Sequence, residues 1–306
     1  MTRIAVLSDI HANYQALEAV LTDCEARAVD TYWYLGDIVV YGPQPNQCIE
    51  RLRELLSSEP IRVRGNNDHI VIRRIKESET SSGALNLPDD SPRELAAERE
   101  LYVLATDAST IWTTRQLTQD NRDWLIGLPN NAITPFGYAD VLLVHASPCE
   151  SVGEEGNYLH DTQDAEEAWL SLPDHKKLCF FGHTHHRTVF RRANTSRKYM
   201  VTERVDVKNE PLAMDDRVLL VNPGSVGQPR DGDATAAYAI YDTERRHIEF
   251  YRVAYPIGET IKALENMHEG LVEVIHEMKK KDNTIDMETA PQKVIETLSQ
   301  RLREAQ

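Results

Sequence analysis

Residues 4–11 read Ile-Ala-Val-Leu-Ser-Asp-Ile-His, a short apolar run that ends in a polar loop. This pattern predicts a buried strand from Ile4 to Leu7. The apolar residues that come next have helical spacing, and Asn13 is placed to cap the N-terminus of that helix. The stretch therefore predicts a strand, a polar loop and a helix in succession.

The same order of elements recurs further along the chain. Strands are predicted at 32–35 and 61–63, and both end at a glycine followed by polar residues, Gly36-Asp37 and Gly65-Asn66-Asn67-Asp68. A helix is predicted between them, from about 46 to 56. Repeated strand–loop–helix units build a mostly parallel sheet, so we expect an α/β fold. Ligands of such sheets bind beyond the carboxyl ends of the strands, where these polar loops lie.

The rest of the chain adds an insertion, a second set of strands and a tail. Residues 76–92 are rich in turn-forming residues and 94–128 have helical spacing, which predicts a loop and then helix in a cap at about 76–130. Strands are also predicted at 141–144, 178–181, 188–190, 199–205, 218–221, 236–241 and 248–253, so a second sheet is expected. We predict a main domain over 1–255 and a C-terminal extension of two polar helices over 256–306.

Composition excludes several classes of protein. The chain has 306 residues, of which 49 are acidic and 34 basic, and its formal net charge is −15. This charge disfavours non-specific binding to nucleic acid or to an anionic membrane. No apolar run is long enough to span a bilayer, and the first ten residues do not resemble a signal peptide. We expect a cytoplasmic protein without a membrane or nucleic-acid partner, and we leave open whether it forms a homo-oligomer.

Residue types that bind metals stand at the ends of the predicted strands. The set is Asp9, His11, Asp37, Asn66, His145, His183 and His185. Asp9 and His11 are two residues apart, as are the last two histidines, so an extended backbone would point both members of a pair to one side. Oxygen and imidazole ligands from several strands suit a pair of borderline divalent cations. A single histidine at a strand end is more often structural, but the joint pattern favours a metal site.

These residues fall into blocks that resemble the five motifs of the calcineurin-like metallophosphoesterases. The blocks are Asp9-Ile-His11, Gly36-Asp37, Gly65-Asn66-Asn67-Asp68, His145 and Gly182-His183-Thr-His185. The segment Asn222-Pro-Gly-Ser-Val-Gly-Gln-Pro-Arg230 further resembles the small bacterial phosphodiesterase branch of that family. The resemblance spans roughly residues 2 to 253. It implies a two-sheet α/β/β/α sandwich, which agrees with the strands predicted above.

The resemblance also implies a dinuclear metal site. It assigns three side chains to each cation and one to both: Asp9, His11 and His185; Asn66, His145 and His183; and Asp37 as the bridge. The two cations keep a net positive charge beside these carboxylates and a bridging hydroxide, and this charge attracts a phosphoryl group. The hydroxide would attack the phosphorus, so the protein need not supply a covalent nucleophile. Manganese is the expected metal, with iron, zinc, nickel or cobalt as alternatives.

The chain departs from the family pattern at two points. The fuller motif has a histidine after Gly-Asn, assigned as the proton donor to the leaving group, and here that position is Asn67. Asn67 and His69 are the candidate catalytic residues. The amide of Asn67 can form hydrogen bonds but cannot deliver a proton near neutral pH, so His69 could substitute as the donor, unless it only opens the following helix. Protein phosphatases of the family carry Asp-Arg after Gly-Asp. Residues 39–42 read Val-Val-Tyr-Gly, without an arginine, which counts against that class.

Two residues of the segment 222–230 each allow two interpretations. Ser225 either presents backbone N–H groups near the metals or forms a tight turn after the strand at 218–221. Arg230 either binds a substrate phosphate or lies at the surface.

We therefore expect a metal-dependent phosphoesterase that hydrolyses small phosphodiesters or phosphoanhydrides, nucleotides among them. A phosphomonoesterase or a protein serine/threonine phosphatase on the same site is the first alternative. A metallophosphoesterase-like scaffold that only binds is the second, although all seven ligand positions are filled. The predicted partner is a small phosphorylated substrate.

Overall fold

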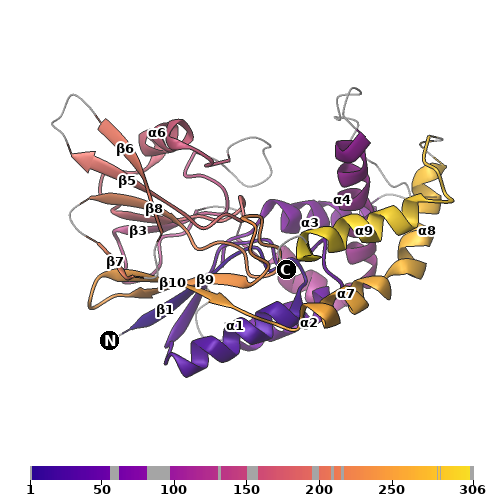
Figure 1. Ribbon diagram of the computed structural model, residues 1–306, viewed down its shortest axis with the longest axis horizontal. Helices are drawn as coiled ribbons and strands as arrows, with labels where there is room; N and C mark the ends of the chain where they lie inside the picture. Colours follow the sequence, from indigo (N-terminus) through magenta and orange to yellow (C-terminus); the bar gives the residue numbers. More distant parts are fainter. Residues whose placement is uncertain are drawn as a thin grey trace.

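Two sheets of five strands each lie face to face, with helices on their outer sides and beyond one end (Figure 1). The computed structural model describes residues 2–55, 62–80, 97–129, 132–149, 158–194, 200–207, 210–214, 217–280, 282 and 284–303. The first sheet contains, in spatial order, β2 (Thr31–Tyr34), β1 (Arg3–Leu7), β9 (Ala236–Asp242), β10 (His247–Val253) and β7 (Leu212–Ala213). The second contains β3 (Val141–Leu143), β4 (Leu178–Phe180), β8 (Val218–Asn222), β5 (Thr188–Asn194) and β6 (Met200–Val205).

Both sheets are mixed, and the prediction of a mostly parallel sheet is wrong. β1 pairs in parallel with β2 but antiparallel with β9, and β10 runs antiparallel to β9 and β7. In the second sheet β3, β4 and β8 are parallel, whereas β5 is antiparallel to β8 and β6. The carboxyl ends of the parallel strands within each sheet point the same way, which brings the loops that follow them together.

The core of the sandwich is an apolar layer between the sheets. Ile4 and Val6 of β1 point into this layer, whereas Ala5 and Leu7 point to the helical side. Residues 4–7 form a continuous apolar run because both faces of the strand are covered. Helix α6 (Thr162–Ser171) packs on the outer face of the second sheet. The layers are therefore α/β/β/α, as predicted.

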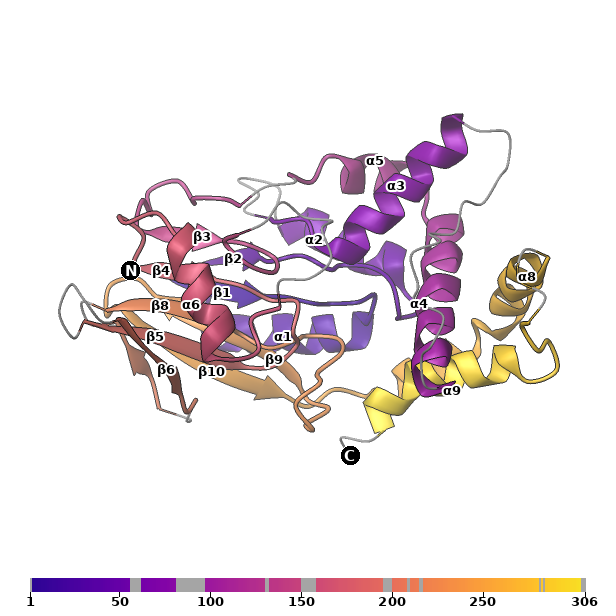
Figure 2. The ribbon, with the colours of Figure 1, turned by 90° about the horizontal axis from the view of Figure 1, so that it is seen from above.

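The remaining helices pack on the other side of the first sheet and beyond its end. Asn13 caps α1 (Tyr14–Ala26) as predicted, since its side chain accepts a hydrogen bond from the N–H of Ala16 at 3.2 Å. Helix α2 (Pro45–Leu55) lies beside α1. Further helices form a lobe at the end of the sandwich away from the N-terminus (Figures 1 and 2): α3 (Asn66–Thr80), α4 (Ala97–Gln116), α5 (Gln119–Ile126), α7 (Ile257–Glu265), α8 (His268–Lys279) and α9 (Ala290–Arg303).

The lobe joins the insertion to the tail of the chain. Helix α4 of the insertion packs against α8 and α9 of the tail. Arg115 of α4 forms an ion pair with Glu277 of α8, with 2.5 Å between nitrogen and oxygen. Gly270 lets α8 approach α4 closely, because a Cβ there would lie 2.6 Å from the indole Nε1 of Trp112. One apolar cluster runs from β1 and α1 through α4 to α9.

Some local predictions are wrong. The third predicted strand is reduced, in its described part, to one bridge between Tyr34 and Arg62, because the N–H of Arg64 donates to the carbonyl of Pro129 and leaves the sheet. Residues 76–80 continue α3 instead of forming a loop, and 81–92 lie outside the described residues.

The tail contains three described helices where two were predicted, and α6 was not predicted at all. Residues Asn266 and Met267 separate α7 from α8. No helix in the described part of the chain is both long enough and apolar enough to cross a membrane.

Candidate metal centre

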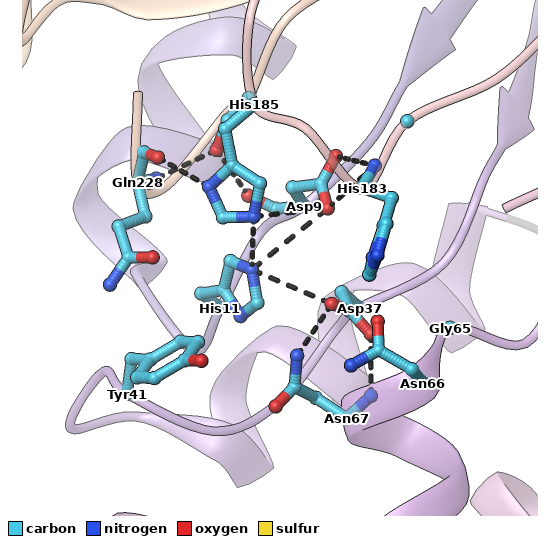
Figure 3. A network of polar contacts seen from close by, with 12 residues as sticks. Asp9, His11, Asp37, Tyr41, Gly65, Asn66, Asn67, His183, His185 and Gln228 are labelled. Carbon is cyan, nitrogen blue, oxygen red and sulfur yellow. Dashed lines mark hydrogen bonds and ion pairs between the residues drawn. The ribbon is translucent and has the colours of Figure 1, made fainter. Parts of the chain in front are cut away.

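All seven predicted ligand residues meet at the end of the sandwich that faces the helical lobe. Figure 3 labels each of them except His145. They come from the loops after β1, β2, β3 and β4 and from the first residue of α3. Asn66 and His183 are partly exposed, and the other members of the set are buried. The group is therefore reached by solvent from the side of Asn66 and His183.

The backbone of five of these residues is left-handed, with φ of 54° at Asp9, 48° at His11, 61° at Asp37, 66° at His183 and 59° at His185. We predicted that the pairs converge on extended backbone, and this is wrong. Left-handed residues other than glycine are uncommon and strained, and they persist where the surroundings hold them. Here the two loops hold each other, since the N–H of His11 donates to the carbonyl of Asp37 at 3.0 Å.

The first cluster contains Asp9, His11, Asp37 and His185. The Nε2 atoms of His11 and His185 lie 3.0 Å apart. Nε2 of His185 lies 3.3 Å from Oδ1 of Asp9, and Nε2 of His11 lies 3.7 Å from Oδ2 of Asp37. Two imidazoles and two carboxylates thus surround one small volume.

The second cluster contains Asp37, His145 and His183. Nε2 of His145 lies 3.5 Å from Oδ2 of Asp37 and 3.0 Å from Oδ1 of Asn66. The two clusters share the carboxylate of Asp37, which is the arrangement expected of a bridging ligand.

The outer nitrogens of three histidines are committed to backbone carbonyls. Nδ1 of His11 lies 3.3 Å from the carbonyl oxygen of Val39. Nδ1 of His145 lies 2.8 Å from that of Leu35, and Nδ1 of His185 lies 2.6 Å from that of Gln228. A carbonyl only accepts, so in the neutral rings Nδ1 carries the hydrogen and the Nε2 lone pair points inward. Two lone pairs then face each other between His11 and His185. A cation between them resolves this contact, so these residues fit a metal site.

Burial keeps most of the imidazoles neutral. It lowers the pKa of His11 to about 4 and that of His183 to about 3. Burial, reinforced by the positive charge of Arg230, also holds the pKa of His185 well below its usual value. Burial acts in the same direction on His145, but the Asp37 carboxylate outweighs it and raises the pKa of His145 to about 9. A cation in the second cluster would therefore replace a proton on His145.

The pKa values of the carboxyl groups of Asp9 and Asp37, which contact these histidines, are shifted in opposite directions. Burial raises the pKa of Asp9 to about 7. Burial would do the same to Asp37, but His145 outweighs it and lowers the pKa of Asp37 below its usual value. Asp37 is therefore the carboxylate that stays charged without a metal.

Two glycines let the backbone touch these carboxylates. A Cβ on Gly65 would lie 2.0 Å from Oδ1 of Asp37, and a Cβ on Gly182 would lie 2.7 Å from Oδ2 of Asp9. No larger residue fits at either position without moving a carboxylate of the cluster.

Asp68 supports the site and had no predicted role. Its carboxylate accepts hydrogen bonds from four backbone N–H groups: Asp37 at 2.9 Å, Ile38 at 2.9 Å, Val39 at 3.3 Å and Gly65 at 3.1 Å. It thereby ties the loop of Asp37 to the start of α3. The available signal was a carboxylate two residues after a predicted ligand, in the first turn of a helix.

Asn67 also contacts Asp37. Its N–H donates to Oδ1 at 2.9 Å and its side-chain amide donates to Oδ2 at 2.7 Å. His69 follows on the same helix, three residues after Asn66, so these two residues share a face of α3.

The segment 222–230 lies behind the ligands. The Asn222 amide donates to the carbonyl of Gly182 at 2.7 Å. The Ser225 hydroxyl donates to the carbonyl of Asp9 at 2.8 Å and accepts the N–H of Gln228 at 2.8 Å. The contact of Ser225 with the site is thus made by its hydroxyl, in a turn behind Asp9.

Arg230 flanks the first cluster and is only partly exposed. Its backbone N–H donates to the carbonyl of His185 at 3.4 Å. Its guanidinium donates to Oε1 of Gln228 at 2.9 Å and to the hydroxyl of Tyr102 at 3.4 Å. The interpretation of Arg230 as an open surface residue is therefore not supported.

Comparison with known proteins agrees with this geometry. An uncharacterized protein of Methanocaldococcus jannaschii is 31% identical over 261 residues, which cover 85% of this chain and 91% of that protein. The crystal structure of a metallophosphoesterase from Sphaerobacter thermophilus is 31% identical, with a TM-score of 0.68 over 100% of this chain and 99% of that one. A hypothetical protein from Pyrococcus horikoshii OT3 shares the fold at 21% identity, with a TM-score of 0.59 over 90% of this chain and 97% of that one.

Residues 2–246 match the calcineurin-like phosphoesterase superfamily domain. This range includes every strand of the two sheets except β10, and every loop that supplies the two clusters. The chain therefore belongs to the calcineurin-like phosphoesterase superfamily.

Proposed function

We propose that this protein is a metal-dependent hydrolase of small phosphodiesters or phosphoanhydrides, nucleotides among them. The observation that carries the proposal is the contact between the Nε2 atoms of His11 and His185, 3.0 Å apart, beside a carboxylate shared with a second cluster. Two neutral imidazole acceptors in this position call for a cation. A second cation at the adjoining cluster makes a site for phosphoryl transfer.

The proposed ligands of the first cation are Asp9, His11 and His185, and those of the second are Asn66, His145 and His183, with Asp37 shared. Manganese is the first choice of metal. When bound, such a pair supplies positive charge for the phosphoryl oxygens and lowers the pKa of a bound water.

The chain's own residues hold this arrangement and leave one side open. Asn67 donates to the shared carboxylate of Asp37, and Asp68 accepts the backbone N–H of Asp37. The ring of Tyr158 stacks on that of His183, with centroids 4.1 Å apart, at the partly exposed side of the site. A phosphoester would approach from this side, since the first cluster is buried.

The amide of Asn67 is committed to Asp37, so it has no part as a proton donor in the proposal. His69 remains the proposed donor to the leaving group, or else a water molecule serves. Leaving groups of low pKa depart without such help, and alkoxides do not. The proposed substrates are therefore activated diesters and anhydrides.

The proposal is tested by hydrolysis of bis-p-nitrophenyl phosphate and of p-nitrophenyl phosphate by metal-free protein reloaded with manganese. We expect the diester to be hydrolysed with the higher kcat/KM. His185→Ala should abolish turnover, whereas His175→Ala, an exposed histidine remote from the clusters, should not. A higher kcat/KM for the monoester would favour a phosphomonoesterase or protein phosphatase. No turnover of either substrate would favour a binding scaffold.

A further inference from the structure

The guanidinium of Arg230 flanks the first cluster and forms no ion pair with a carboxylate among the described residues. Arg230 donates hydrogen bonds to two neutral acceptors, Oε1 of Gln228 and the hydroxyl of Tyr102. The Arg230 residue is only partly exposed. A partly exposed guanidinium that has no ion pair within the chain can bind an anion from outside it.

Two tyrosines connect this guanidinium to the metal-ligand residues. The ring of Tyr41 lies edge-on against that of His11, with centroids 4.8 Å apart (Figure 3). Its hydroxyl lies 3.0 Å from that of Tyr102, which in turn accepts a hydrogen bond from Arg230. The backbone of Arg230 also contacts His185. The side chains of Tyr41, Tyr102 and Arg230, here called the wall, therefore form a polar row from His11 to His185 of the first cluster.

The wall combines two parts of the chain. Tyr41 and Arg230 follow strands of the sandwich, whereas Tyr102 lies on α4 of the insertion. The insertion therefore contributes to the surroundings of the metal centre, and it does so through a polar atom.

The chemistry of the wall suits an oxyanion. A guanidinium presents its N–H groups in a fork that matches the oxygens of a phosphate, and a neighbouring hydroxyl adds a donor. The site is partly shielded from water, which strengthens such bonds relative to those at an open surface. An apolar or cationic group would leave the charge of the Arg230 guanidinium without a counter-charge.

We propose that Arg230, Tyr102 and Tyr41 bind a second phosphoryl group of the substrate, which is not cleaved, beside the metal pair. The inference rests on the proposed function and narrows its substrate class. Preferred substrates would carry two neighbouring phosphoryl groups, as in a nucleoside diphosphate or another phosphoanhydride.

The test measures binding, so that it does not depend on turnover. Isothermal titration of the manganese-loaded protein gives the Kd of methylenediphosphonate, which has two phosphoryl groups, and of methylphosphonate, which has one. Phosphonoacetate, with a carboxylate in place of the second phosphoryl, separates the two kinds of anion. Chelation of manganese by the ligands is common to all variants and cancels in their comparison.

We expect the wild type to bind methylenediphosphonate at least about 10-fold more tightly than methylphosphonate. Arg230→Gln should remove most of this preference, and Tyr102→Phe, which keeps the ring, should reduce it by about 3- to 10-fold. Arg27→Gln, at the end of α1 and far from the site, is the matched control and should keep the preference.

Three results would overturn the inference: no preference in the wild type, a preference for phosphonoacetate over the diphosphonate, or an unchanged preference in folded Arg230→Gln. If Arg230→Gln does not fold, an unchanged preference in Tyr102→Phe overturns it instead. A preference for the diphosphonate without any ester hydrolysis would contradict the proposed function and leave the subsite standing.

Discussion

Asn67 donates hydrogen bonds to both carboxylate oxygens of Asp37, through its backbone N–H to Oδ1 and through its side-chain amide to Oδ2 (Figure 3). Only 5% of Asn67 is exposed, so water does not compete for these bonds. Together they fix the plane of the carboxylate that belongs to both clusters. A position where the family motif has histidine is used here to orient Asp37.

Asn67→Ala should weaken metal binding. The substitution removes the side-chain bond and keeps the backbone one, and loss of a partner of this kind typically costs about 10- to 100-fold in metal affinity. Calorimetric titration of metal-free protein with manganese measures the change. Asn266→Ala, in the exposed turn between α7 and α8, is the control. Equal affinities in the two variants would show that the amide does not orient Asp37.

Asp68→Asn should destabilise the fold. Both oxygens of Asp68 accept backbone N–H groups, so either orientation of the amide turns its NH₂ toward two donors. We expect a loss of roughly 2–4 kcal/mol in the free energy of unfolding, as for buried hydrogen bonds to a charged acceptor. Urea denaturation of the metal-free protein measures it. Asp174→Asn, at an exposed position, should change stability little, and a similar small effect at Asp68 would refute the assigned role.

His69→Ala should slow only substrates with poor leaving groups. If His69 donates the proton, its loss costs roughly 10²- to 10⁴-fold for alkyl esters and little for nitrophenyl esters. The measurement is kcat/KM for a series of diesters with graded leaving-group pKa. A loss that is the same across the series, or no loss, would remove His69 from the proton-donor role.

Gly270→Ala should loosen the contact between insertion and tail. Its Cβ would lie 2.6 Å from Nε1 of Trp112, so the helices have to separate, at a cost of about 1–3 kcal/mol in the free energy of unfolding. Gly258→Ala in α7 meets no atom within 4 Å and should leave stability unchanged or raise it. If both variants are equally stable, the close approach of α8 to α4 does not contribute to folding.

The sequence alone predicts the parts of the fold that depend on local pattern. The run Ile4 to Leu7 is uniformly apolar because both faces of β1 are covered, and this is visible without a structure. The antiparallel pairing of β1 with β9 is not visible, since it joins residues more than two hundred positions apart. The packing of the tail on α4 is hidden for the same reason.

The site, like the fold, is predictable from the sequence where it depends on local pattern and not where it depends on long-range contacts. Residue type and position at strand ends were enough to select the side chains that meet in the two clusters. Their convergence through left-handed backbone could not be read from spacing, because φ at Asp9 or His183 is set by contacts between loops. The place of Arg230 beside Tyr102 likewise depends on how the insertion folds back over the sandwich.

The central claim is that the shared carboxylate of Asp37 joins two cation sites in one chain. The most direct measurement is the manganese content per chain, by elemental analysis, after metal-free protein is loaded and unbound metal is removed. We predict two manganese ions per chain for the wild type and fewer for Asp37→Ala. One ion or none in the folded wild type, or two ions retained in Asp37→Ala, would contradict the claim.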